Sequence, residues 1–354
     1  MPTAGAVNDR EKVPNVRGAQ RTNKDRTPRA HGMGGVRKIF GTEKEVLHMK
    51  KGVLKYHAAA VFTVFVWGIT FVSTKYLEGA LSSLEILFIR YIIAYTTLWI
   101  LCPERPTVCG AKQEGYMFAA ALSGAALYQY LENVAVEYTS PASVSFITAT
   151  APIFTALLAS RLLGEKLTAK IFIGMLISLV GVFFICFGDS RTLETGLTGD
   201  LIIFFSIWLW AVYSILVKKI SEFGISRFQV TRRLFFYSLV VMLPFMIFGN
   251  HGEALRHLKS ISIAGNLLFL GVFASAICFA GWNMSVEKLG ATTTSRYLFL
   301  SPLVTLVAQS VYNRSIIGGA ALVGMAVTLV GIAVSEFKFK PKTAENAAKE
   351  KKVA

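Results

Sequence analysis

The chain carries one residue pattern twice, about 150 residues apart, and this duplication restricts the folds that it can adopt. The shared residues are Asn133, Val136, Glu137, Pro152 and Thr155 in the first copy and Asn283, Val286, Glu287, Pro302 and Thr305 in the second. Upstream, at a spacing shorter by seven, the matching residues are Trp67, Lys75 and Arg90 with Trp210, Lys218 and Arg233. Such a repeat indicates that one supersecondary unit has been duplicated.

About ten apolar segments of roughly 18–22 residues are long enough to cross a hydrocarbon core about 30 Å thick. We expect them at residues 58–77, 83–102, 116–136, 141–162, 169–188, 200–220, 229–249, 262–284, 292–312 and 317–336. Helices are expected because isolated strands would leave backbone groups unpaired in lipid. The predicted fold is an all-α integral membrane protein with about ten transmembrane helices.

Each copy holds five of these segments, and this odd number makes the second copy enter the membrane from the opposite side. The prediction is therefore two inverted five-helix repeats, an architecture that transporters use for alternating access. The first repeat is expected at residues 57–188 and the second at 199–336. Basic tails, 1–56 and 337–354, flank them.

Composition supports a membrane location. Hydrophobic residues make up 53% of the chain and charged residues 16%, whereas a water-soluble chain of this length needs more charge to cover its surface. Lys and Arg are concentrated in the two tails and in the loops expected on the same side. The positive-inside rule then predicts a multi-pass protein of the cell (inner or plasma) membrane with both termini in the cytoplasm.

The N-terminal tail holds about half of the net charge of +16. Its 13 Lys or Arg and 5 Asp or Glu show no apolar periodicity, so we expect disorder, with attraction to anionic lipid headgroups as a further interpretation. Met49, followed by Lys50 and Lys51, resembles a natural start, which leaves open that residues 1–48 are an upstream extension. The charge therefore predicts no nucleic-acid partner. The expected partners are a small-molecule substrate and the lipid bilayer, and no oligomeric state is indicated.

Five motifs occur in a characteristic order: WGITFVSTK at 67–75, Arg90-Tyr91, NVAVEYTSPAS at 133–143, PIFTA at 152–156 and LGEKLT at 163–168. This order resembles the EamA family of the drug/metabolite transporter superfamily, over roughly residues 55–337. The resemblance implies a ten-helix carrier that moves small metabolites such as amino acids, often outward and coupled to protons. The second copy departs from the pattern, because Arg314-Ser315 replaces Gly164-Glu165.

Several polar and aromatic residues within the spans are candidates for substrate binding. They are Trp67, Thr70, Tyr130, Asn133, Trp210, Tyr213, Asn283 and Arg296. The two tryptophans lie about ten residues into their helices, deeper than the interfacial belt that Trp often marks. Tyr130 precedes Asn133 by three residues, so both can share a helical face. For the two asparagines, an interhelical hydrogen bond is the alternative.

Arg296 is a charge in only one copy, because Phe146 occupies its equivalent position. A guanidinium within a span costs free energy unless a partner neutralises its charge. The sequence neighbours of Arg296 are uncharged. A substrate carboxylate would match its geometry, so an anionic group is expected on the substrate. Snorkelling of the side chain to the lipid headgroups is the alternative.

Other residues within the spans suggest a mechanism. Pro152 and Pro302 are predicted helix breaks or hinges, because proline lacks the amide hydrogen, and tightly packed kinks are the alternative. Arg90 and Arg233 match across the repeat and are interpreted as structural charges within the membrane. Glu132, opposite Trp282 in the repeat, is a candidate proton-coupling carboxylate, unless it lies at the outer interface.

The sequence shows no nucleophile–base pair, phosphate loop or zinc-ligand spacing, and its four cysteines form no CxxC pair. We therefore predict no enzyme, no cofactor and no metal site. The predicted function is secondary transport of small organic metabolites, with export and proton coupling implied by the resemblance. The alternatives are a non-transporting membrane scaffold or receptor and, with less support, a membrane-embedded enzyme, which would need clustered His, Asp or Glu within the spans.

Overall fold

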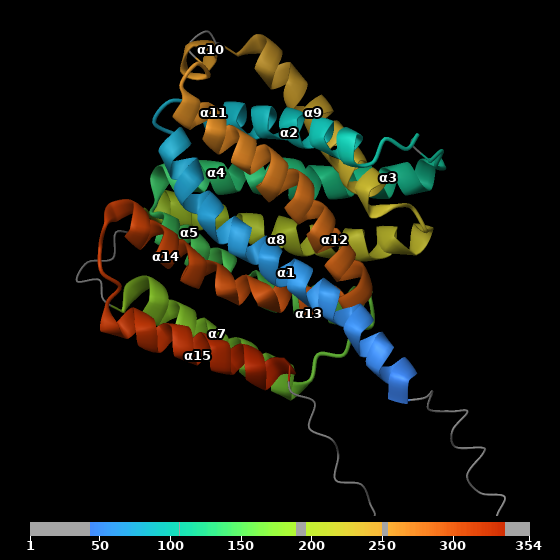
Figure 1. Cartoon of the computed structure of the whole chain (residues 1–354), viewed down its shortest axis with the longest axis vertical. Coiled ribbons are helices and arrows are strands. Elements are labelled where there is room, and N and C mark those ends of the chain that lie inside the picture. The colour runs from blue at the N-terminus through green and yellow to red at the C-terminus, as the bar shows by residue number, and fades with distance from the viewer. Residues whose placement is uncertain (1–42, 106, 189–195, 250–253, 337–354) are drawn as a thin grey trace, which may run out of the picture. The chain divides into compact units, whose positions relative to one another are not determined.

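The computed structural model describes residues 43–105, 107–188, 196–249 and 254–336. The regular secondary structure of these residues is helical, and they form no strand (Figure 1). The chain divides into two compact units, Met1–Met49 and Lys50–Ala354. Only the beginning of one helix belongs to the described part of the first unit, so the expectations for the tails and for a start at Met49 fall largely outside the described residues. The second unit is described below.

The first copy of the repeat contains seven helices. They are α1 (Glu43–Leu77), α2 (Ser83–Leu101), α3 (Ala111–Ala120), α4 (Gln129–Tyr138), α5 (Pro141–Thr148), α6 (Ala151–Leu162) and α7 (Ala169–Phe187). A π-helical segment, Ala121–Tyr128, joins α3 to α4 without a break. The Ser82 side chain accepts a hydrogen bond from the Glu85 amide, and Glu85 accepts one from the Ser82 amide, which fixes the start of α2.

The second copy follows the same order. Its helices are α8 (Leu197–Ile220), α9 (Arg227–Phe248), α10 (Ala254–His257), α11 (Ile261–Leu268), α12 (Cys278–Leu289), α13 (Ala291–Ser295), α14 (Ser301–Asn313) and α15 (Gly319–Glu336). A π-helical segment, Phe269–Ile277, joins α11 to α12 at the place equivalent to the first π segment. A 3₁₀ segment, Arg296–Leu300, joins α13 to α14.

Seven helices among the described residues are long and apolar enough to cross a membrane. They are 52–77, 83–101, 141–162, 169–187, 197–223, 227–248 and 261–289, and each matches an expected span. The other three expected spans fall on α3–α4, on α13–α14 and on α15. The first turn of α3 carries Lys112 and Glu114, α13–α14 is interrupted, and α15 is shorter. The protein is thus a multi-pass α-helical membrane protein.

Both proline positions coincide with helix interruptions. Pro152 and Pro302 each stand in the first turn of a helix, α6 and α14. Proline lacks the amide hydrogen that a continuous helix would use, and it is well tolerated in a first turn. The chain therefore restarts its helix at these two equivalent places.

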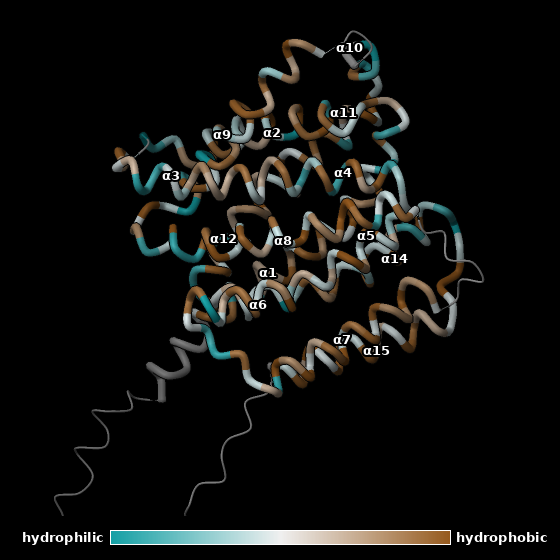
Figure 2. The backbone as a smooth tube through the Cα atoms, turned by 180° about the vertical axis from the view of Figure 1, so that it is seen from behind, coloured by the Kyte–Doolittle hydropathy of each residue, from teal (hydrophilic) through white to brown (hydrophobic). Residues whose placement is uncertain are grey.

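The final helices of the two copies pack closely side by side (Figure 1). Gly174 lies against Gly331, and the equivalent Gly324 lies against Gly181. An added Cβ on these glycines would come within 2.6–2.7 Å of the backbone oxygen of the partner glycine. The small residues allow the backbones to approach, as is common between membrane helices. Figure 2 shows apolar residues along most of both helices.

The helices end in two regions, here called the Leu77 end and the Phe223 end. The Leu77 end contains the last turns of α1 and α4 and the first turns of α2 and α8. The Phe223 end contains the last turns of α2, α6, α8 and α12 and the first turns of α3, α9 and α13. Figure 1 shows these as the left and right sides of the view.

Candidate functional site

A small cavity lies at the centre of the second unit, between helices of both copies. Its volume is about 20 Å³, enough for about one water molecule. It is lined by Trp67, Thr70 and Phe71 of α1, Arg90 of α2, Tyr128, Gln129 and Glu132 around the start of α4, Thr148 of α5, Trp210 of α8 and Ser301 of α14. Four predicted residues, Trp67, Thr70, Trp210 and Glu132, therefore share one cavity wall with Arg90.

A guanidinium and a carboxylate lie in this wall. Arg90 is 3% exposed, and its Nε donates to the Ser275 hydroxyl at 2.9 Å. Glu132 accepts hydrogen bonds from the Tyr128 hydroxyl at 2.6 Å and from Gln129 Nε2 at 3.0 Å. Charged groups within a membrane protein characteristically mark substrate or ion pathways. This pair provides opposite charges around a single cavity.

The π-helical segments hold the two charges in position. Tyr128 ends the first segment and orients Glu132. Ser275 of the second segment binds Arg90, and the carbonyl of Ala274 accepts the Trp67 indole N–H at 2.9 Å. Such segments are frequent at functional sites, but nothing in the residue pattern signalled them here.

Aromatic rings form one side of the site. The ring centroids of Trp67 and Trp210 are 5.4 Å apart, and Trp282 lies 5.1 Å from Trp67 and 5.7 Å from Trp210. The Nε1 atoms of Trp210 and Trp282 are buried without a hydrogen-bond partner among the described residues. Such an orphaned donor is costly, so the Trp210 indole, in the cavity wall, can serve a polar ligand atom.

The other five predicted substrate residues do not line the cavity: Tyr130, Asn133, Tyr213, Asn283 and Arg296. Asn283 accepts from the Tyr213 hydroxyl at 2.7 Å and donates to Thr231 Oγ1 at 3.1 Å. Asn133 donates to the carbonyl of Ser83 at 3.3 Å. These contacts connect neighbouring helices, as in the interhelical hydrogen bond that was the alternative interpretation of the two asparagines. Tyr130 is 37% exposed and does not line the cavity.

Arg296 is already engaged within the protein. It is 4% exposed, and its Nη1 donates to the carbonyl of Ser335 at 2.7 Å while Nη2 donates to Thr293 Oγ1 at 3.2 Å. The guanidinium therefore has hydrogen-bond partners within the protein, and its contact with a substrate carboxylate stays a prediction. Ser335 lies near the end of α15, where helix carbonyls lack partners and attract a cation. Its 39-residue separation from Arg296 hid the contact from local sequence reasoning.

The two matching arginines have different surroundings. Arg90 lines the cavity, whereas Arg233 forms an ion pair with Glu114 at 2.8 Å near the Phe223 end. Arg232, the residue before Arg233, is 3% exposed and donates at 2.8 Å to the carbonyls of Cys102 and Glu104. Arg233 and Arg232 therefore hold the Phe223 ends of helices together, and only Arg90 reaches the site.

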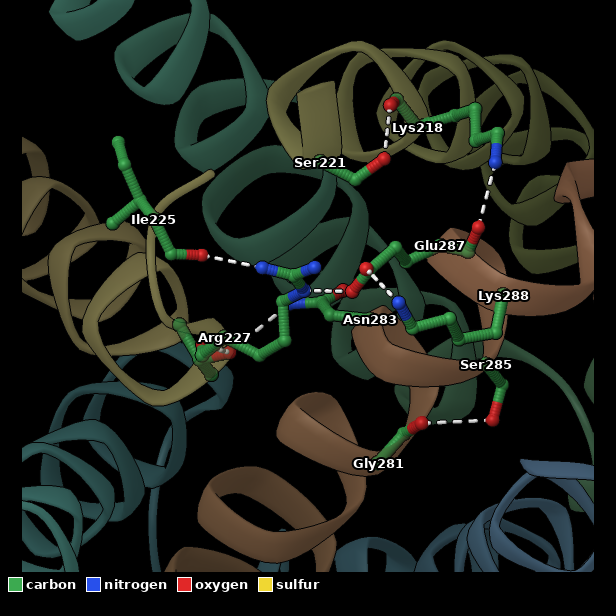
Figure 3. A network of polar contacts seen from close by, with 10 residues as sticks. Lys218, Ser221, Ile225, Arg227, Gly281, Asn283, Ser285, Glu287 and Lys288 are labelled. Carbon is green, nitrogen blue, oxygen red and sulfur yellow. Dashed lines mark hydrogen bonds and ion pairs between the residues drawn. The ribbon is translucent and has the colours of Figure 1, made fainter. Parts of the chain in front are cut away.

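Glu287 organises the Phe223 end of α12 (Figure 3). Its carboxylate forms ion pairs with Arg227 and with Lys288, and its backbone carbonyl accepts from Lys218 at 2.6 Å. At the Leu77 end, the equivalent Lys75 donates to the carbonyl of Val136, also at 2.6 Å. A lysine of the first helix thus caps the third span in each copy.

Within the described residues there is no group of three or more His, Cys, Asp or Glu side chains that could hold a metal ion. The site instead combines a buried guanidinium, a half-buried carboxylate and aromatic rings among helices that are apolar enough to cross a membrane. These features describe a polytopic membrane transporter, a protein class that acts by binding and moving a solute.

The comparisons with known proteins identify the family. The chain matches the model of the EamA-like transporter family over residues 54–187 and 197–337, and it belongs to that family. It is 24% identical over 280 residues to an uncharacterized transporter of Archaeoglobus fulgidus, covering 79% of this chain and 98% of that protein. It is 25% identical over 281 residues to a probable terminal-alkyne amino-acid exporter of Streptantibioticus cattleyicolor, covering 77% and 91%. The protein is a transporter and not an enzyme.

One solved structure has a similar fold. Its title is "Crystal structure of protein", and it superposes with a TM-score of 0.64 over 79% of this chain and 96% of its own. The sequence identity is 16%, so this likeness concerns the fold alone.

Proposed function

We propose that the protein is a secondary exporter of a small zwitterionic metabolite, such as an amino acid, and that the central cavity, which must widen from its present volume of about 20 Å³ to admit the solute, is its substrate site. The main observation in support of this proposal is that Arg90 and Glu132 line one cavity together with Trp67 and Trp210. The Arg90 guanidinium suits a carboxylate, and the Glu132 carboxylate suits an ammonium group. The aromatic rings suit the remainder of the solute. The similarity to a probable amino-acid exporter supports the same substrate class.

Proton coupling at Glu132 belongs to this proposal. A carboxylate within the membrane is a common proton carrier in transporters. Here it can bind either a proton or the ammonium group of the solute, and competition between the two would couple their movements. The hydrogen bonds from Tyr128 and Gln129 would hold the carboxylate in place in both states.

The proposed architecture is ten transmembrane helices in two inverted five-helix repeats, 57–188 and 199–336. The contacts of α7 with α15 support it, because Gly174–Gly331 and Gly324–Gly181 are the same pair exchanged between copies. Such exchange is expected around a two-fold axis perpendicular to two antiparallel helices. The proposal includes a cytoplasmic Phe223 end, where most loop Lys and Arg residues lie, and hinge roles for Pro152 and Pro302.

Amino-acid flux in reconstituted vesicles, with and without a proton gradient, tests the function. Arg90→Gln should reduce flux at least tenfold, since it removes a charged hydrogen bond to the substrate. Glu132→Gln should abolish the response to the gradient while leaving protein insertion unchanged. Arg256→Gln and Glu222→Gln, which alter exposed charges, serve as matched controls. Saturable amino-acid binding without flux in the parent protein would instead indicate a receptor.

A further inference from the structure

Glu165 joins the two copies at the Phe223 end. Its Oε1 accepts from the backbone amide of Ala291 and its Oε2 from that of Thr292, both at 2.8 Å. Gly164, with φ of 67°, turns the chain after α6 and brings the carboxylate to the first turn of α13. Gly290 has φ of 91°, and an added Cβ there would meet Glu165 Oε1 at 2.8 Å. Gly290 therefore leaves room for the carboxylate, and Gly164 adopts its left-handed turn without steric cost.

At the equivalent place of the Leu77 end, the counterparts of the Glu165 carboxylate and of the Ala291 amide hydrogen are both missing. Arg314, the counterpart of Gly164, makes the same left-handed turn with φ of 53°. The next residue, however, is the short and exposed Ser315 in place of Glu165. Ala291 is replaced by Pro141, which has no amide hydrogen to donate. The asymmetry is thus encoded in both the acceptor and the donor.

A groove occupies the Leu77 end where this contact is missing. Its volume is about 600 Å³, and it separates the end of α14 from the start of α5. Its lining includes Thr139, Ser140, Pro141, Gln309, Tyr312 and Asn313. Gln309 is half-buried in this wall, whereas its counterpart Ala159, in the turn of α6 before Glu165, is 0% exposed. The groove at the Phe223 end, which Glu165 lines, is smaller, at about 430 Å³. The two ends of the unit therefore differ in openness at the equivalent positions 159 and 309.

We propose that Glu165 is a latch that holds the Phe223 end closed while the Leu77 end is open, and that its release exposes the Phe223 end during transport. This inference rests on the proposed transport function. Glu165 acts as a positioning residue, because it joins α6 of one copy to α13 of the other without lining the central cavity. Replacement partners for the released carboxylate lie nearby, since Lys112, Lys218 and Lys219 line the same groove as Glu165.

The test compares two equivalent reporter cysteines, Ala159→Cys and Gln309→Cys, in a background without the four native cysteines. The rate of modification by a small maleimide is measured in purified protein without substrate, so the readout does not depend on transport. In the parent, the cysteine at position 309 should react faster. Glu165→Ala should raise the rate at position 159 about tenfold, the effect of losing a charged hydrogen bond, and should lower the rate at position 309.

Three further variants distinguish a latch from a fold-stabilising contact. Glu165→Gln retains one carbonyl acceptor, so it should have an intermediate effect, and the exposed Glu222→Gln should have none. Ser315→Glu together with Pro141→Ala supplies both missing halves at the Leu77 end, and it should slow modification at position 309 several-fold. The proposal is overturned if Glu165→Ala leaves both rates unchanged or raises both together, because the second result indicates local unfolding.

Discussion

Five cationic side chains among the described residues fall into two groups according to what they contact. Lys75, Lys218, Arg232 and Arg296 donate to backbone carbonyls near helix ends. Helix C-termini present unpaired carbonyls and a negative dipole end, so a cation there is stabilised without a carboxylate. Arg90 differs, because its contact is a side-chain hydroxyl and it lines the cavity. The first group supports the structure, and Arg90 is available for a ligand.

Arg296→Gln tests this division. The variant loses charged hydrogen bonds near the end of α15, so the free energy of unfolding should fall by about 1.5–3 kcal/mol. Amino-acid flux per folded molecule should stay within about twofold of the parent, in contrast to Arg90→Gln. Thermal unfolding in detergent and vesicle flux measure the two quantities. A loss of flux at unchanged stability would contradict this division and would indicate that Arg296 contacts the substrate.

A second prediction concerns Glu78, which directly follows α1. Burial raises the pKa of Glu78 from 4.5 to about 7, although Lys75, 3.6 Å away, opposes the shift and Glu137 adds to it. Because the folded protein holds this proton more tightly than the unfolded chain, the stabilising contribution is present below pH 4.5 and is lost as the pH rises through 7.

Glu78→Gln removes this titration while keeping the shape of the side chain. The variant should therefore unfold at a higher temperature than the parent at about pH 8, and the difference should shrink towards about pH 5. Thermal unfolding in detergent at both pH values measures it, with the exposed Glu222→Gln as the control. A pH-independent difference would show that the Glu78 carboxylate does not titrate in this range.

The candidate site was only partly predictable at this scale. Trp67 and Trp210 were found because their depth and repeat symmetry are visible in the sequence, and both line the cavity. Asn133 and Asn283 satisfy the same criteria but hydrogen-bond to neighbouring helices. Polarity within a span shows that a partner exists, and only the packing of distant helices decides whether that partner is protein or ligand.

Among the elements, helix type was harder to predict than helix position. Apolar length located the seven spans that the helices match, and the prolines located the starts of α6 and α14. The π-helical segments 121–128 and 269–277 lie within continuous apolar runs that contain no proline. A π turn depends on how carbonyls and side chains of adjacent helices meet, and this information is absent from a local residue pattern.

The close contact of α7 with α15 gives a prediction at this scale. A Cβ on Gly181 would lie 2.4 Å from the amide nitrogen of Thr328, so Gly181→Ala must force the helices apart. We expect it to lower the free energy of unfolding by about 1–3 kcal/mol. Gly265→Ala is the matched control, because nothing lies within 4 Å of its added Cβ and alanine favours the helix. Equal stability of the two variants would contradict tight packing at Gly181.

For the molecule as a whole, the two copies share a framework and differ where a transport cycle needs a direction. The lysine caps at Lys75 and Lys218 are equivalent in both copies. Arg90 has become a cavity residue while Arg233 pairs with Glu114, and Glu165 has no counterpart in the second copy. Symmetry makes two conformations similar in energy, and these differences allow each to be favoured by a different ligand.

The orientation in the membrane is the remaining prediction, and it follows from charge. At the Phe223 end the loops and helix ends carry Arg105, Lys112, Arg161, Lys166, Lys170, Lys218, Lys219, Arg227 and Lys288. At the Leu77 end the described residues carry Lys75, Arg256, Lys259 and Arg314. Short loops rich in Lys and Arg are retained in the cytoplasm, so the Phe223 end should face inward.

Single cysteines at exposed positions of the two ends test this orientation. Tyr138→Cys and Asn313→Cys should react with a membrane-impermeant maleimide in intact cells, because both lie at the Leu77 end. Lys112→Cys and Glu222→Cys should react only after the membrane is permeabilised, because both lie at the Phe223 end. The reversed pattern would place the basic loops outside, and the wide groove at the Leu77 end would then open to the cytoplasm. Equal reaction at all four positions in intact cells would contradict the assignment of the two ends to opposite sides of the membrane.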